Sequence, residues 1–132
     1  MKTSELTGHA LNWAVAKCEG MLAEPWLWGD EQEVLIRYKF STNWAQGGPI
    51  IEREDIAISP LPDGLWRAYA PDGTTRWLTK GSPTPTSGVE VFNWTYKQQG
   101  YHPLIAAMRC YVASKLGHEV EIPSELTQGE SK

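Results

Sequence analysis

The amino-acid sequence predicts an α+β fold: a mostly antiparallel sheet, arranged as a meander, with two main helices packed on one face. Two observations support this prediction. Helical patterns lie near both ends of the chain, at residues 8–19 and 103–116. Between them, short apolar runs are separated by Pro-Asp-Gly sequences at 62–64 and 71–73. These are typical of turns, because proline fixes φ and glycine accepts positive φ.

The predicted helix at 8–19 has a signal at each end. Thr7 precedes it as a candidate N-cap, and Gly20 follows it as a left-handed stop. Three residues at helical spacing are expected to face the core: Leu11, Val15 and Cys18.

The region after this helix is expected to change from a strand to a loop. Residues 34–40 alternate, with Val34, Ile36, Tyr38 and Phe40 on one face, which predicts a half-buried strand. Residues 41–48 are polar and rich in glycine, so we expect them to be irregular. Pro49 then suits the first position of a short helical turn at 50–55.

The meander itself is predicted from three short strands at 56–58, 65–69 and 75–78. The segment at about 82–101 is interpreted as an inserted flap. Its centre at 91–96 is either a further edge strand or an ordered flap.

The helix at 103–116 has the clearest amphipathic pattern in the chain. Pro103 stands at its first position and Gly117 lies past its end. Its apolar residues recur every four positions: Leu104, Met108, Val112 and Leu116. Residues 120–122 predict a short closing strand. We therefore expect one α+β domain at 1–123 and a flexible polar tail at 124–132.

The composition favours some classes of protein over others. A chain of 132 residues with 41% hydrophobic residues can form one domain with its own core. No apolar run has the length of a membrane span, and the N-terminus lacks a signal segment, so we expect a cytoplasmic protein without a membrane partner. The net charge of −4, with both signs interspersed, disfavours binding to duplex nucleic acid.

Neither a metal site nor a catalytic set is recognisable in the sequence. Cys18 and Cys110 lie in predicted helices without zinc-ligand spacing, and we expect both to be buried, reduced thiols. His9, His102 and His118 are far apart, with no nucleophile at a recognisable spacing. The sequence therefore predicts no cofactor, leaves catalysis undecided and favours a binding protein over an enzyme.

Four stretches of the sequence resemble the NinX-like proteins of tailed phages. They are residues 4–8 with 10–16, 41–54, 103–117 and 119–123, and they include Ser-Thr-Asn-Trp-Ala-Gln-Gly-Gly-Pro at 41–49. This family consists of small non-structural proteins of lambdoid phages and prophages. The resemblance therefore implies an accessory role in the cytoplasm of a bacterial host, and it supplies no catalytic residues. One departure is the extra sequence between residues 82–85 and the C-terminal helix.

The segment around the glycine pair is the strongest candidate for a ligand site. Trp44 can stack on a flat group, Arg53 can pair with a phosphate, and amide and carboxylate side chains can hydrogen-bond to a base edge. The candidate ligand-binding residues are Asn43, Trp44, Gln46, Gly47, Gly48, Glu52, Arg53 and Trp94. The alternative is structural: Arg53 pairs with a neighbouring carboxylate and Trp44 packs under the meander.

These observations favour a non-catalytic phage accessory protein that sequesters a small polar, nucleotide-like ligand, with a role in counter-defence against the host. The alternative is a protein-interaction factor that modulates a host or phage protein. In that case exposed aromatic residues such as Trp26, Trp28 and Trp94 would dock on the partner. Exposed tryptophans are also compatible with a homodimer.

Overall fold

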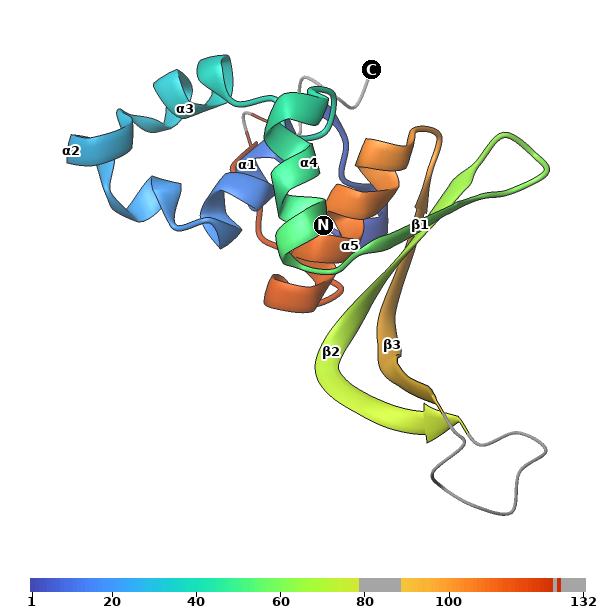
Figure 1. The fold of residues 1–132 in the computed structure, drawn as a ribbon. Helices are drawn as coiled ribbons and strands as arrows, with labels where there is room; N and C mark the ends of the chain where they lie inside the picture. The colour runs from blue at the N-terminus through green and yellow to red at the C-terminus, as the bar shows by residue number, and fades with distance from the viewer. Residues whose placement is uncertain (79–88, 125, 127–132) are drawn as a thin grey trace.

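The computed structural model describes residues 1–78, 89–124 and 126. Its helices are α1 (Gly8–Cys18), α2 (Pro25–Trp28), α3 (Glu31–Arg37), α4 (Trp44–Arg53) and α5 (Pro103–Leu116), with 3-10 turns η1 (Thr3–Glu5) and η2 (Met21–Ala23). The strands are β1 (Ala57–Pro60), β2 (Trp66–Leu78) and β3 (Val89–Gly100). Figure 1 shows the helices gathered on one side of the sheet.

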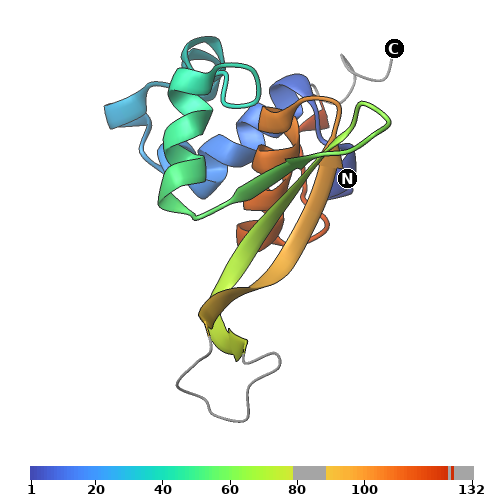
Figure 2. The same ribbon diagram turned by 45° about the vertical axis from the view of Figure 1, so that its right-hand side comes forward.

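The sheet is an antiparallel meander in the order β1-β2-β3. β1 pairs only with the start of β2, from Pro60 opposite Trp66 to Ala57 opposite Tyr69. β2 and β3 pair from one end to the other, with an interruption of the register between Ala70 and Thr75. Beyond Tyr69 the sheet is therefore a two-stranded arm, which projects away from the helices in Figure 2.

α5 is the central helix of the core. It contacts all three strands, α1 and α4. The predicted four-residue stripe is confirmed: Leu104, Met108 and Val112 are fully buried, and Leu116 packs against the core. The α+β meander with helices on one face is therefore also confirmed, with α5 on the sheet and α1 packed mainly against α5.

One predicted strand is a helix. Residues 31–37 form α3, whereas the alternating pattern predicted a strand at 34–40. Asp30 caps this helix, because its carboxylate accepts a hydrogen bond from the Glu33 N–H at 2.9 Å. Val34 and Leu35 are buried side by side while Ile36 is 72% exposed, which contradicts a strand's alternation. The cap and the core contacts outweigh the β propensity of the segment.

Residues 44–48, predicted to be irregular, are helical. α4 begins at Trp44 and contains Gly47, Gly48 and Pro49, so Pro49 does not occupy the first position. The cap is Asn43, whose side-chain oxygen accepts from the Ala45 N–H at 2.9 Å. This cap starts the helix five residues earlier than the proline signal suggested.

The two Pro-Asp-Gly sequences have different structures. The first is a turn between β1 and β2, closed by the Leu61 N–H donating to the Leu65 carbonyl at 2.8 Å. The second lies within β2, where the register shifts between Ala70 and Thr75. The separate strand predicted at 75–78 is therefore a continuation of β2. Its partner is β3, which contains the predicted edge strand at 91–96.

The chain ends also depart from the prediction. Residues 120–122 form no strand, and Glu119 makes only an isolated bridge with Lys2. Residues 82–88 of the predicted flap lie outside the described residues, as does most of the predicted tail at 124–132.

Candidate functional site

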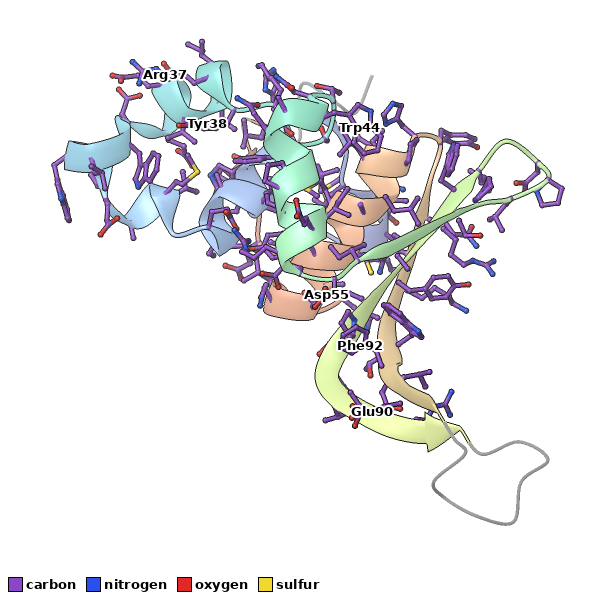
Figure 3. The ribbon with its side chains drawn as sticks, in the orientation of Figure 1. Arg37, Tyr38, Trp44, Asp55, Glu90 and Phe92 are labelled. Atoms are coloured by element: carbon purple, nitrogen blue, oxygen red, sulfur yellow. The ribbon has the colours of Figure 1, made fainter. Side chains whose placement is uncertain are left out.

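The predicted ligand residues of α4 do not converge on one position. Trp44 begins the helix and Arg53 ends it, so at about 1.5 Å per residue they lie roughly 13 Å apart along its axis. Figure 3 shows Trp44 and Asp55 at opposite ends of α4. Trp44 is half exposed and lies beside His102, with 6.1 Å between ring centroids, rather than under the meander.

Two further residues of the predicted set hold α4 in place. Gln46 accepts from the Lys39 N–H at 2.5 Å and donates to the Arg37 carbonyl at 2.7 Å, which connects α3 with α4. At Gly47 a Cβ would stand 2.5 Å from the Phe40 carbonyl oxygen and 2.7 Å from Leu104 Cδ2. Gly47 therefore allows close packing of α4, while Gly48 has open space around it.

Arg53 belongs to a cluster of charged groups at the C-terminal end of α4. Its guanidinium donates to both carboxylate oxygens of Glu19, at 3.1 and 2.6 Å, and to Glu54 at 2.9 Å. It also donates to the Tyr111 hydroxyl at 3.2 Å, and that hydroxyl donates to Glu19. Lys115 pairs with Glu54 at 3.2 Å. An anion at Arg53 would have to compete with these carboxylates.

The ionised forms in this cluster stabilise one another. Burial opposes ionisation of Glu19, but hydrogen bonds from Arg53 and Tyr111 outweigh it and lower the pKa of Glu19. Hydrogen bonds to Glu19 and Glu54 raise the pKa of Arg53. A hollow of about 310 Å³ beside the cluster is lined by charges of both signs: Arg53, Glu54, Asp55, Asp72 and Lys115.

A different cavity, of about 550 Å³, lies along the edge of β3. Its walls come from η1, the end of β3, α5 and the segment after α5. The lining residues are Ser4, Leu65, Lys97, Gln98, Gln99, Gly100, Tyr101, Arg109 and His118. None of them is a carboxylate, in contrast to the hollow beside Arg53. We call this the Arg109 cavity.

Arg109 is the most buried charge of this cavity. Its Nε donates to the Leu6 carbonyl at 2.8 Å, and Nη1 donates to the Gln99 carbonyl at 2.6 Å. Both acceptors are neutral, and no carboxylate of the described residues forms an ion pair with Arg109. Burial therefore lowers the pKa of Arg109 without a compensating counter-ion.

The other walls are fixed by the backbone near the N-terminus. The Thr3 N–H donates to the His118 carbonyl at 2.8 Å, and the Thr3 hydroxyl donates to the Gly117 carbonyl at 2.7 Å. These bonds hold η1 against the segment after α5, so that Ser4 and His118 line the same cavity. Tyr101 adds an aromatic ring that is 82% exposed.

Arg109 is not among the ligand residues predicted from the sequence. Its carbonyl partner Leu6 is 103 positions away in the chain, so no local motif marks the cavity. One signal was present in the sequence: Arg109 interrupts the apolar run at 104–113. A single arginine inside such a run indicates either snorkelling to the surface or a specific internal partner.

Other chemical features of the described residues give no competing site. No group of three or more His, Cys, Asp or Glu residues is placed there to hold a metal ion. Cys110 is buried and Cys18 is partly buried, and neither forms a disulfide. Burial raises the pKa of each thiol to about 12. No helix within the described ranges combines the length and apolar character needed to cross a membrane.

The fold and the cavity define a small α+β protein with a carboxylate-free, basic cavity beside a helix-backed meander. The chain belongs to the NinX family of phage proteins, because the family model described as "Bacteriophage P22, NinX" matches residues 2–115. This span contains every residue of the Arg109 cavity except His118. A search of curated proteins finds no match.

Proposed function

We propose that this protein is a non-catalytic phage accessory protein that binds a small anionic, nucleotide-like ligand in the Arg109 cavity. The observation that supports the proposal is the partly buried guanidinium of Arg109, which lies among Lys97, His118 and neutral groups. In a chain with a net charge of −4, this cavity is a local basic exception. An anion would supply the counter-charge that Arg109 lacks among the described residues.

The cavity offers the groups that a nucleotide requires. Arg109 and Lys97 can pair with phosphate oxygens, the Ser4 hydroxyl and the Gln99 amide can hydrogen-bond, and Tyr101 can stack on a base. Its volume of about 550 Å³ lies within the range of about 300–1,000 Å³ that is usual for small-molecule sites.

Binding without chemistry is sufficient for a counter-defence role. A protein that sequesters a nucleotide-derived signal lowers its free concentration through complementary contacts alone. The groups lining the cavity provide charge, hydrogen-bond donors and aromatic surface. These are the means of recognition that the proposal requires, acting in the cytoplasm of the host.

Calorimetric titration with mononucleotides, cyclic dinucleotides and inorganic phosphate tests this proposal. We expect Arg109→Gln to weaken nucleotide binding at least tenfold, equivalent to about 1.4 kcal/mol. Lys97→Ala, at an exposed position, should weaken binding without unfolding the protein. Arg53→Gln is the matched control and should bind like the wild type. The proposal fails if no ligand binds, or if Arg53→Gln loses as much affinity as Arg109→Gln.

A protein-interaction role is the second candidate, and it rests on α2. Trp26 is 81% exposed and Leu27 is 63% exposed, and no residue of α2 is buried. Acidic residues follow directly in α3. A partner with an apolar groove and a basic rim would therefore fit the surface formed by α2 and α3. Trp28 is less suited, because it packs against Tyr38 at 6.2 Å between ring centroids. Trp26→Ala should abolish binding to such a partner, and light scattering would show whether that partner is a second copy.

A further inference from the structure

Within the described residues, the helices lie on one side of the sheet and leave the face opposite α5 open (Figure 1). The strand residues on the covered face are marked by burial: Ala68, Ala70, Gln98 and Gly100. At Gly100 a Cβ would stand 2.9 Å from Ile105 of α5, and Cys110 of α5 lies 3.6 Å from the Ala68 carbonyl oxygen. α5 therefore packs directly beneath this face.

Strand alternation places a different set of residues on the open face. Arg67 pairs in register with Gln99, and Tyr69 pairs with Lys97, so these four side chains project together. With its amide oxygen turned toward Arg67, Gln99 accepts from Arg67 Nη2 at 2.7 Å. The open face thus presents two cations, an aromatic ring and an amide, without a carboxylate.

A hollow of about 480 Å³ extends this face toward the arm. It is lined by Ala57, Tyr69, Trp94, Thr95 and Lys97. Trp94 is partly exposed and lies against Phe92 in an edge-to-face contact, with 5.6 Å between ring centroids. Two carboxylates lie nearby. Asp72 accepts hydrogen bonds from Thr95 at 2.7 Å and from Thr74 at 2.5 Å, and Glu90, which lines a hollow with Trp94, accepts from Thr75 at 3.0 Å. Asp72 is therefore engaged with hydroxyl groups of the bulge.

Lys97 lines both this hollow and the Arg109 cavity, so the two lie next to each other along β3. Aromatic rings and cations occur together along the resulting strip, from Trp94 through Lys97 to Tyr101 and Arg109. Along β3, residues 94–101 span roughly 23 Å at about 3.3 Å per residue. This length exceeds what one nucleotide occupies, since neighbouring nucleotides of a duplex strand are about 3.4 Å apart.

We propose that this strip binds single-stranded nucleic acid. Bases would stack on Trp94, Tyr69 and Tyr101, and phosphates would pair with the cations between them, as in other sequence-tolerant sites for single strands. The inference rests on the proposed function and deepens it, because the nucleotide in the Arg109 cavity becomes one unit of a longer strand. A duplex would not fit, since its bases are already stacked.

Fluorescence anisotropy with a labelled 12-nucleotide single strand, as DNA and as RNA, tests the proposal on the full chain. We expect Lys97→Ala to weaken binding at least tenfold and to reduce the salt dependence by about one phosphate contact. Trp94→Ala should weaken binding about tenfold without changing the salt dependence. Trp26→Ala, which removes an exposed tryptophan from α2, is the matched control and should bind like the wild type. The duplex of the same sequence should bind at least tenfold more weakly.

A second measurement separates this inference from the proposed function. Mononucleotide binding should require Arg109 but be unchanged in Trp94→Ala. If mononucleotides bind and the 12-nucleotide strand binds no more tightly, the strip is wrong and the cavity alone is the site. If neither binds, both proposals fail. If Trp26→Ala lost as much affinity for the strand as Trp94→Ala, the binding would be non-specific. If a poly-glutamate peptide displaced the strand as well as an unlabelled strand does, the site would bind acidic protein. Either result would overturn the inference.

Discussion

Arg53 and Arg109 have opposite surroundings, and the difference concerns counter-ions rather than exposure. The side chain of Arg53 is half exposed, yet it contacts two carboxylates and a phenol. Arg109 is more enclosed, and its described partners are two neutral carbonyl groups. The more exposed arginine is therefore the less available one, because a ligand would have to displace carboxylates that already bind it.

This contrast shows what a local sequence pattern leaves out about the environment of an arginine. Arg53 follows a glycine pair and a tryptophan, an arrangement that resembles a ligand loop. Its principal counter-ion, Glu19, is 34 positions away and could not be identified locally. The environment of an arginine is set by tertiary contacts, whereas a motif records only its neighbours.

The largest expected effect comes from alanine substitution in the glycine pair, Gly47 and Gly48, that precedes Arg53 in α4. Gly47→Ala should destabilise the protein by about 2 kcal/mol, because its Cβ would collide with the Phe40 carbonyl. Gly48→Ala has no such contact and should stabilise α4 by up to about 1 kcal/mol through helix propensity. Urea unfolding measures both. Equal effects of the two substitutions would contradict the close packing of Gly47 against Phe40 and Leu104.

The larger elements of the fold could be predicted because their signals are local and mutually consistent. Thr7 occupies the N-cap position of α1, although its side chain makes no capping hydrogen bond, and Pro103 and Gly117 bound α5 as predicted. The stripe from Leu104 to Val112 is buried, and Leu116 packs against the core. The errors occurred where two local signals competed. At residues 34–40 the alternation indicated a strand, but the Asp30 cap and the adjacent buried pair Val34 and Leu35 produce a helix.

The bulge in β2 and the basic cavity depend on contacts that no local pattern records. The Pro-Asp-Gly sequence at 71–73 has ordinary turn chemistry, but Asp72 bonds to Thr95 of β3, so the strand continues past it. The Arg109 cavity joins η1, β3 and α5, which are distant in sequence. The strand pairing of Lys97 with Tyr69 became evident only from the register.

The pH dependence of stability distinguishes the carboxylate-bound Arg53 from Arg109. The folded-state pKa of Glu19 lies below its ordinary value of 4.5, so its stabilisation is present above that pH and is lost as the pH falls through the folded pKa. Glu19→Gln should therefore cost about 1 kcal/mol at pH 7, after allowance for the exposure of Arg53. Below pH 4.5 the difference from the wild type should shrink.

Two controls distinguish the Glu19 cluster from general charge effects. Glu52→Gln, at an exposed position of α4 outside this cluster, should change stability little. The difference in free energy of unfolding between Arg109→Gln and the wild type should not decrease between pH 5 and pH 3. The reason is that none of the described partners of Arg109 is a carboxylate. If this difference did decrease at low pH, as expected for Glu19→Gln, both arginines would have carboxylate counter-ions.

The smallest expected effect concerns Asp55, which follows the Arg53 end of α4 in a left-handed conformation with φ of 56°. The Ile56 N–H donates to the Ile51 carbonyl at 3.1 Å, so the chain closes the helix in a motif that favours glycine. Asp55→Gly should therefore stabilise the protein by about 0.5–1 kcal/mol in urea unfolding. Asp55→Ala is the matched control and should give no gain, since alanine retains the steric cost of the left-handed region.

If Asp55→Gly instead destabilised the protein, the carboxylate would have an interaction that offsets its strain. The hollow beside Arg53 would then be the better candidate for a site. If it stabilised the protein and left nucleotide affinity unchanged, the binding function would remain with Arg109.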